Sequence, residues 1–163
     1  MRIAVFSDSH GNIAPMRRMA GELTPDMLFH LGDYTADAAA LRQAFPDIPL
    51  YSVAGNNDYG AAEPLTLALE LEGVKLVLTH GHSFGVHSGT ERFLQYALAR
   101  NAAAALFGHT HRAFCEQRSG VWLLNPGRAG RGLFSLSGAT CGLLTLEQGQ
   151  IAWELLEIPD PDR

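Results

Sequence analysis

Short apolar runs that stop abruptly at polar residues dominate the first third of this chain of 163 residues. The runs 3–6, 27–31 and 50–54 have the length and the apolar character of buried strands. The segments between them, 13–23 and 37–45, have the composition of helices. This alternation of strand, loop and helix predicts parallel βαβ units, and therefore an α/β fold.

The rest of the chain is richer in strands than in helices. Glu72 and Gly73 lie between two apolar runs and predict a hairpin turn. From residue 113 onward, short apolar runs alternate with glycine turns, which is typical of strands. We therefore expect one helix at 91–100, and strands that include 65–71, 74–78, 103–107, 141–146 and 151–158.

Length and composition fit one globular domain. Of the 163 residues, 47% are hydrophobic and 18% charged, which allows a substantial core. We predict a single domain over residues 1–158 and a frayed tail at 159–163, where two prolines follow the last strand. The net charge of −5 argues against a broad basic surface, so neither a nucleic acid nor a membrane is an expected partner.

The sequence also predicts a cytoplasmic location. The apolar run near the N-terminus is too short for a secretory signal, and no apolar stretch is long enough to span a bilayer. Two cysteines, Cys115 and Cys141, do not indicate a disulfide framework. The oligomeric state is left open.

Polar clusters follow five of the expected strands. Because the carboxyl ends of parallel strands lie at one edge of a sheet, these clusters can meet in space. Aspartate and histidine, with an asparagine carbonyl, suit divalent ions such as Mn, Fe or Zn. In an extended segment, residues two apart point the same way, so a pair such as Asp8 and His10 can reach one site. The clusters are Asp8-Ser9-His10, Gly32-Asp33, Gly55-Asn56-Asn57-Asp58, Thr79-His80-Gly81-His82 and Gly108-His109-Thr110-His111.

Each cluster has an ordinary structural explanation when it is taken alone. Asp8 can cap a helix, Asp33 can belong to a turn, and the segment 55–58 has the composition of a tight turn. A single histidine is more often packed or solvated than a ligand, and this explanation is applied to His30 and His87. Five of the seven histidines, however, lie in the clusters at strand ends. The joint pattern therefore favours a metal site.

The order of these motifs resembles that of the calcineurin-like metallophosphoesterases, over nearly the whole chain. The stretches THGHSFGV and LNPGR are most similar to the compact YfcE-type phosphodiesterases. The resemblance implies a four-layer αββα sandwich of two mixed β-sheets with a centre of two divalent metal ions. The motifs that carry it are Asp8-x-His10, Gly32-Asp33, Gly55-Asn56-x-Asp58, His80 and Gly108-His109-x-His111.

Transferred position by position, the resemblance implies how the ligands divide between the two ions. Mn²⁺ is favoured, with Fe, Zn or Ni as alternatives. A carboxylate suits the bridging position because its two oxygens can hold two cations. The implied ligands are Asp8, His10 and His111 for the first ion, Asn56, His80 and His109 for the second, and Asp33 as the bridge.

The implied reaction is hydrolysis of a small phosphoester by a hydroxide that bridges the two metals. Phosphodiesters are favoured as substrates. A phosphomonoesterase or nucleotide pyrophosphatase with the same centre is the alternative enzyme. A non-catalytic interaction module of the same fold is the alternative from another class, and the complete ligand set argues against it.

Three further residues are candidates for contact with substrate. Asn57 stands where many larger relatives have a histidine that assists the leaving group. A neutral amide cannot act as an acid, so Asn57 is expected to donate a hydrogen bond to a phosphate oxygen. His82 is either a proton donor or a packed histidine. Arg128, like Arg131, either contacts the phosphate or lies in solvent.

Overall fold

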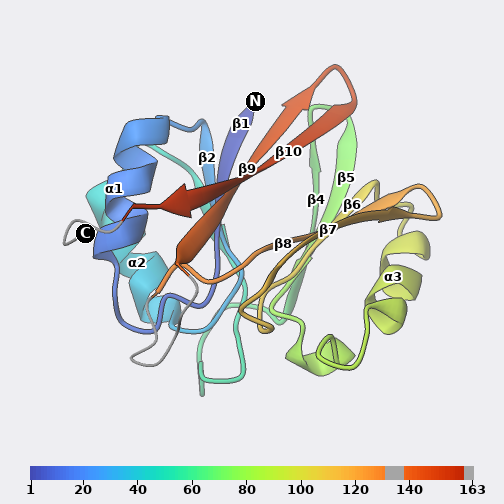
Figure 1. The fold of residues 1–163 in the computed structure, drawn as a ribbon, viewed down its shortest axis with the longest axis horizontal. Helices are drawn as coiled ribbons and strands as arrows, with labels where there is room; N and C mark the ends of the chain where they lie inside the picture. The colour runs from blue at the N-terminus through green and yellow to red at the C-terminus, as the bar shows by residue number, and fades with distance from the viewer. Residues whose placement is uncertain (131–137, 160–163) are drawn as a thin grey trace.

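A computed structural model describes residues 1–130 and 138–159, and Arg131 therefore lies outside the described residues. In these ranges the chain forms four layers, which Figure 1 shows in the order helices, sheet, sheet, helix. The predicted αββα sandwich of two mixed sheets is confirmed. None of the described helices is long and apolar enough to cross a membrane.

Sheet A and two helices form the first two layers. α1 (Ala14–Leu23) and α2 (Thr35–Ala44) cover its outer face (Figure 1). The predicted βαβ units are confirmed, because the first three strands pair in parallel. The strand order is β10 (Gln150–Ile158), β9 (Ala139–Glu147), β1 (Arg2–Phe6), β2 (Met27–His30) and β3 (Leu50–Ser52).

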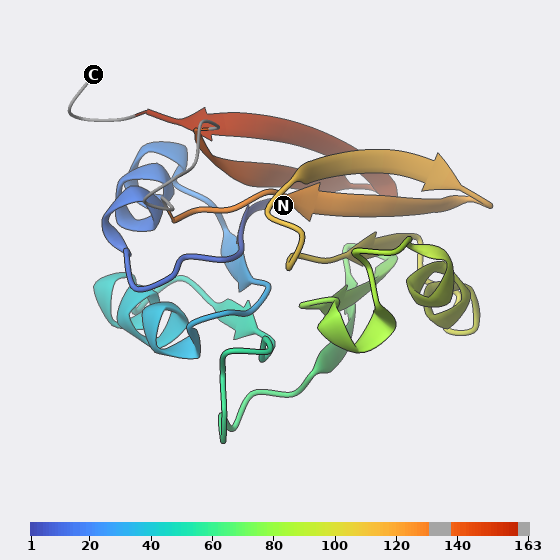
Figure 2. The same cartoon turned by 60° about the horizontal axis from the view of Figure 1, so that its bottom comes forward.

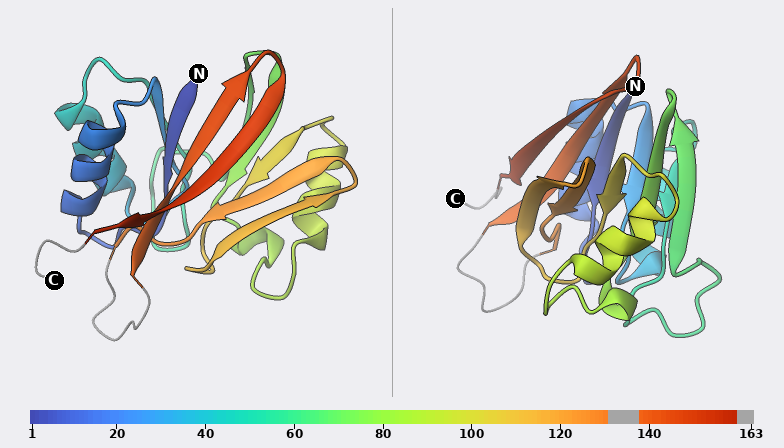
Figure 3. Two further views of the ribbon diagram at one scale, coloured as in Figure 1. Left: turned by 45° about the horizontal axis from the view of Figure 1, so that its top comes forward. Right: turned by 90° about the vertical axis from the view of Figure 1, so that its right-hand side faces the viewer.

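Sheet B and α3 (Glu91–Leu98) form the other two layers, with α3 on the outer face of the sheet (Figure 3). A short 3-10 helix, η1 (His82–Phe84), precedes α3. The predicted hairpin around Glu72 and Gly73 is confirmed by antiparallel pairing of its two strands. The strand order is β4 (Thr66–Leu71), β5 (Val74–Thr79), β6 (Ala104–Leu106), β8 (Val121–Pro126) and β7 (Ala113–Arg118).

The alternation of side chains along the strands divides the core into layers. In β1, Ile3 and Val5 face sheet B, whereas Ala4 and Phe6 face α1 and α2. This is the period of two that a strand buried on both faces requires. A slip of one residue would exchange the two faces, so burial on both sides fixes the register of β1 against β2.

Some element boundaries differ from those that the sequence predicts. α2 begins at Thr35 rather than at residue 37, because Asp58 accepts a hydrogen bond of 2.7 Å from the backbone N–H of Thr35. This capping group comes from a loop 23 residues away, so the local sequence does not announce it. β3 ends at Ser52, since the N–H of Ala54 bonds to the carbonyl of Pro64 instead of to a strand.

His30, at the end of β2, is a packed histidine, as expected for a residue with no partner motif. It is fully buried, and its Nε2 lies 3.1 Å from the hydroxyl of Ser9 in the loop after β1. Burial lowers the pKa of His30 to about 4. The neutral ring therefore supports the first of the loops that carry the polar clusters.

We predict that the metal-free protein loses stability between pH 6.5 and about 4 partly through His30. The pKa of His30 is 6.5 when unfolded and about 4 when folded, so the unfolded chain takes up the proton first. This contribution is fully present above pH 6.5 and is lost as the pH falls, by about 3 kcal/mol in all. Urea unfolding from pH 7 to pH 4 measures it.

His30→Gln should flatten this part of the pH dependence, whatever its effect on stability at pH 7. Gln43→Asn, at an exposed position that carries no titratable group, should keep the slope of the wild type. Equal slopes in the wild type and His30→Gln would contradict the assignment.

Candidate metal centre

The polar clusters meet where the carboxyl ends of strands from both sheets face each other. Parallel strands β1, β2 and β3 end there in sheet A, and parallel strands β5 and β6 end there in sheet B. Figure 2, which brings this end forward, shows the loops of the two halves converging across the middle of the molecule. The clusters therefore share one site although two different sheets present them.

Two hydrogen bonds tie the sheets together at this point. The backbone N–H of His109, after β6, donates to Asp8 Oδ2, after β1, over 3.1 Å. His80 Nδ1, after β5, lies 2.8 Å from the carbonyl oxygen of Leu31, after β2. Since a carbonyl oxygen only accepts, His80 Nδ1 donates to Leu31, and the other ring nitrogen, Nε2, faces the centre.

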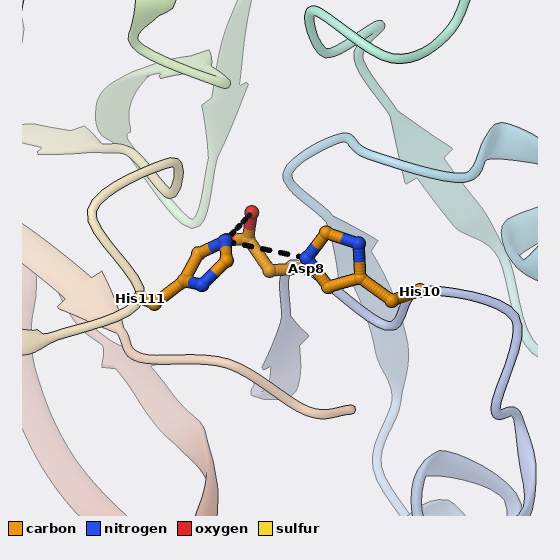
Figure 4. A group of neighbouring side chains, drawn as sticks. All are labelled: Asp8, His10 and His111. Atoms are coloured by element: carbon orange, nitrogen blue, oxygen red, sulfur yellow. Dashed lines mark hydrogen bonds and ion pairs between the residues drawn. The ribbon is translucent and has the colours of Figure 1, made fainter. Parts of the chain in front are cut away.

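Asp8, His10 and His111 form the first group of converging ligand atoms (Figure 4). His111 Nε2 lies 3.2 Å from His10 Nε2 and 3.2 Å from Asp8 Oδ1. The other oxygen of Asp8 accepts hydrogen bonds from Ser7 Oγ and from the backbone of His109. Asp8 Oδ1 is buried and makes no hydrogen bond among the described residues, and the ring nitrogen that faces it is His111 Nε2.

Asp8, Asp33 and His80 form the second group. His80 Nε2 lies 3.4 Å from Asp33 Oδ1 and 3.9 Å from Asp8 Oδ1. Asn56 Oδ1 is 3.1 Å from the same nitrogen. One imidazole nitrogen thus faces three oxygen acceptors, and a divalent cation among them would bind all four atoms.

His109 lies at the edge of the second group, with its ring centroid 4.9 Å from that of His80. All seven expected ligands are therefore in one region. Asp8 belongs to both groups, whereas the resemblance implies that Asp33 is the bridge. The bridging role of Asp33 stays a prediction.

The backbone brings the ligands together by turning sharply. Extended geometry was expected to align Asp8 with His10 and His109 with His111, and this is wrong. The φ angles of these four residues are positive, between 50° and 66°, and that of Asp33 is 58°. Residues other than glycine seldom adopt this left-handed region, and such strain concentrates at functional sites.

Two glycines allow the loops to approach each other this closely. A Cβ at Gly55 would collide with the carboxylate and the backbone of Asp33, and one at Gly108 would collide with the hydroxyl of Ser7. Neither obstacle is the far end of a flexible side chain. Glycine is therefore required at both positions by space.

Charge and burial set the protonation of the ligands. Burial alone would raise the pKa of Asp8, but His111, His80 and Ser7 together lower it. The contact with Asp8 raises the pKa of His111, in opposition to burial. Burial, with the neighbouring His80 and His87, lowers the pKa of His109 to about 4. At neutral pH, Asp8 is ionised and His109 is neutral, which are the forms that bind metals.

Asn57 holds the carboxylate of Asp33 through both of its donors. Its backbone N–H donates to Asp33 Oδ1 over 3.1 Å, and its side-chain amide donates to Asp33 Oδ2 over 2.6 Å. In this structure the amide thus contacts the protein at the place where a phosphate contact was expected. The neighbouring Asp58 stabilises the loop by accepting a bond of 2.7 Å from the N–H of Gly55.

The other two candidates for substrate contact lie beside the ligands. The His82 ring centroid is 5.5 Å from that of His80, and burial followed by the charge of His80 lowers the pKa of His82. A lowered pKa leaves His82 neutral near pH 7, which weakens it as a proton donor. Arg128 is buried after β8, and its charge acts on His111.

Sequence reasoning missed several residues that shape the site. Asn125 is fully buried and donates to the carbonyl of Gly108 over 2.9 Å, which fixes the loop after β6. Tyr34 lies edge-on to His10, with ring centroids 5.4 Å apart. His87 is exposed, yet its ring centroid lies 4.4 Å from that of His109. A buried asparagine before a Pro-Gly turn was the one available sequence signal.

The donor set fits divalent ions of intermediate softness. It combines imidazole nitrogens with carboxylate and amide oxygens. Such a mixed set suits Mn, Fe or Zn better than it suits calcium, which prefers a shell of oxygen ligands alone. Asp8 Oδ1, which makes no hydrogen bond among the described residues, and His80 Nε2 both face the centre, where a cation would bind them. These residues can therefore hold metal ions.

Known proteins share both sequence and fold with this chain. A family model described as the calcineurin-like phosphoesterase superfamily domain matches residues 1–149. The probable metallophosphoesterase YsnB of Bacillus subtilis (strain 168) is 30% identical over 130 residues, which are 78% of this chain and 74% of that protein.

Three crystal or solved structures illustrate the shared fold. A predicted phosphoesterase from Streptococcus pneumoniae TIGR4 has a TM-score of 0.80 and 25% identity, covering 96% of this chain and 88% of that one. A novel archaeal phosphodiesterase has a TM-score of 0.72 and 20% identity, covering 96% and 100%. A Vps29 single mutant from Entamoeba histolytica has a TM-score of 0.75 and 18% identity, covering 98% and 100%. The last two similarities establish the fold alone.

We predict that Asn57→Ala weakens metal binding about 10- to 100-fold, the range seen when a hydrogen-bond partner of a ligand is removed. The substitution deletes the 2.6 Å bond to Asp33 Oδ2 and keeps the backbone bond to Oδ1. Calorimetric titration of the metal-free protein with Mn²⁺ measures the change. Asn12→Ala, at an exposed asparagine, is the matched control and should bind as the wild type does. Unaltered affinity in Asn57→Ala would show that Asp33 needs no such support.

Proposed function

The chain belongs to the calcineurin-like phosphoesterase superfamily, and from this premise we propose that it is a phosphodiesterase that uses two divalent metal ions. One observation supports this proposal most strongly. Carboxylate oxygens and imidazole nitrogens converge at the candidate metal centre from two sheets, and one buried carboxylate oxygen, Asp8 Oδ1, makes no hydrogen bond among the described residues. A divalent cation suits such a donor set, and a centre with residual positive charge attracts phosphate.

Each proposed ligand has a position that suits it. Mn²⁺ is the favoured ion, and Fe, Zn or Ni are alternatives that the same donors accept. Asp33 would bridge the two ions, and Asn57 would orient it. The proposed set is Asp8, His10 and His111 for one ion, and Asn56, His80 and His109 for the other.

Divalent ions bound here would activate water near neutral pH and neutralise charge on the phosphate oxygens. The chain's own residues prepare the site for that chemistry. Asp8 and Asp33 supply two negative charges against the four of two dications, so the site stays positive toward an anionic ester. Arg128, buried beside His111, adds positive charge on the same side.

The arrangement favours esters whose leaving group departs without a proton. Asn57 replaces the histidine of many larger relatives and has no acidic proton near pH 7. His82 is neutral at that pH because burial lowers its pKa. Phosphodiesters with acidic leaving groups are therefore the proposed substrates, and a monoesterase with the same centre is the second candidate.

The free energy that this site costs the folded protein argues against a non-catalytic module of the same fold. Asp8 and Asp33 are buried at the sheet junction, and five ligands have strained backbones. A scaffold gains nothing from a buried carboxylate oxygen that makes no hydrogen bond among the described residues, or from histidines whose backbones are held at left-handed angles. An enzyme that binds metal has a use for both.

We predict that Asp33→Asn and His109→Ala each lower metal-dependent hydrolysis of bis(p-nitrophenyl) phosphate by at least about 100-fold, since each removes a proposed ligand. Release of nitrophenolate with Mn²⁺, beside metal analysis of the purified proteins, measures activity and occupancy together. Asp47→Asn, at an exposed aspartate, should retain both. Full activity and metal content in Asp33→Asn and His109→Ala would refute the proposed centre.

A second prediction concerns the leaving group. Asn57→His and Asn57→Ala both lose the amide bond to Asp33, but only the histidine can donate a proton. Relative to Asn57→Ala, Asn57→His should hydrolyse diesters with alcohol leaving groups at least about tenfold faster, because general acid catalysis contributes that much or more. Steady-state rates on a dinucleotide and on bis(p-nitrophenyl) phosphate give the comparison. If the ratio of the dinucleotide rate to the bis(p-nitrophenyl) phosphate rate were the same in Asn57→His and Asn57→Ala, the wild type would not be limited by the lack of a general acid at position 57.

A further inference from the structure

A cavity of about 710 Å³ opens beside the candidate metal centre, between the segment 86–91 and β7. Its inner end is formed by His87 and Thr110. The ring of His87 lies 4.4 Å from that of His109, and Thr110 stands between His109 and His111. The volume is that of a site for a small molecule. A ligand in the cavity would therefore reach the metal centre at one end.

One wall of the cavity is aromatic. Phe107 and Phe114 line it, with ring centroids 5.9 Å apart. Phe107 belongs to the buried core under α3, but Phe114 lies on the edge strand β7 and is only half-buried. Phe114 thus presents part of its ring to the cavity, where a flat ligand ring can pack.

Arginine and carboxylate groups line the remainder. Arg112 follows His111 directly, and its guanidinium has no ion pair among the described residues. At the far end, Arg118 is 2.9 Å from Glu116 and 3.7 Å from Glu91. That end offers both hydrogen-bond donors and acceptors, and Arg112 adds a further cation to the lining.

We propose that this cavity receives the organic arm of the phosphoester, and that the arm is a nucleoside. The inference rests on the proposed function and names its substrate class, nucleotide-type phosphoesters. Phe114 packs against the base, Arg112 contacts the sugar oxygens, and the polar far end binds the edge of the base. A plain alkyl arm has neither a flat face for the ring of Phe114 nor polar edges for the donors and acceptors of the far end, so it fits less well.

Binding measurements test the subsite for the organic arm independently of hydrolysis. Adenosine 5′-monophosphate and methyl phosphate carry the same phosphate, so their affinities for the Mn²⁺-loaded protein differ only through the arm. Isothermal titration should show adenosine monophosphate binding at least about tenfold more tightly, the effect expected when one base stacks on an aromatic side chain. Equal affinities would overturn the proposal, whether or not the protein hydrolyses esters.

Two variants place the arm in this cavity rather than elsewhere. Phe114→Leu keeps an apolar side chain against Phe107 but removes the ring, and Arg112→Gln removes an exposed cation. In each, the affinity ratio of the two phosphates should fall to about threefold or less. Arg17→Gln, an exposed arginine on α1, should keep the full ratio. A ratio unchanged in both Phe114→Leu and Arg112→Gln would place the arm outside the cavity and overturn the proposal.

Turnover distinguishes failure of this inference from failure of the proposed function. Thymidine 5′-(p-nitrophenyl phosphate) and methyl p-nitrophenyl phosphate share one leaving group. A nucleoside subsite predicts a kcat/KM at least about tenfold higher for the thymidine ester. Hydrolysis of both at the same rate would support the phosphodiesterase and reject the subsite. Hydrolysis of neither would reject the phosphodiesterase, and the binding ratio would still decide whether the cavity holds a nucleoside.

Discussion

Two buried carboxylates, Asp8 and Asp33, control the architecture of this protein. Both lie where the sheets meet, and two like charges in a place that excludes water are strongly unfavourable without compensation. The chain supplies part of it through the Ser7 hydroxyl, the His109 backbone and the two donors of Asn57. The rest of their negative charge calls for a positive charge at the same point. This explains why imidazole groups from both sheets, which can bind a cation, surround it.

The sheets are arranged to make this junction possible. A single parallel sheet presents its polar strand ends along one edge, but here two sheets present theirs to each other. The core between them is apolar along its length, so polar groups are confined to the end where the strands stop. Within a few residues of the strand ends, ligand residues with left-handed backbone angles turn the chain sharply. Glycines, which have no side chain, then allow the loops of the two sheets to lie close together.

The sequence predicts those features that depend on local pattern. Alternating apolar runs identified the βαβ half, and ligand types at strand ends identified the residues that converge. It failed where partners come from elsewhere in the chain. Asp58, 23 residues along the chain, accepts the hydrogen bond with which α2 begins, and the side chain of Asn57 donates to the carboxylate of Asp33. The extended geometry assumed for Asp8 and His10 was wrong because strain at a site is enforced by tertiary contacts, which no local pattern contains.

The bonds that join His109 to Asp8 and His80 to Leu31 connect the two sheets at the candidate metal centre. An ion that binds only the folded state, in which these ligands meet, stabilises that state in proportion to the logarithm of its free concentration. The supply of metal in the surroundings would then govern how long the protein survives proteases, as well as whether it works. A shortage of the ion would lower the free energy of unfolding and raise the fraction of chains open to degradation.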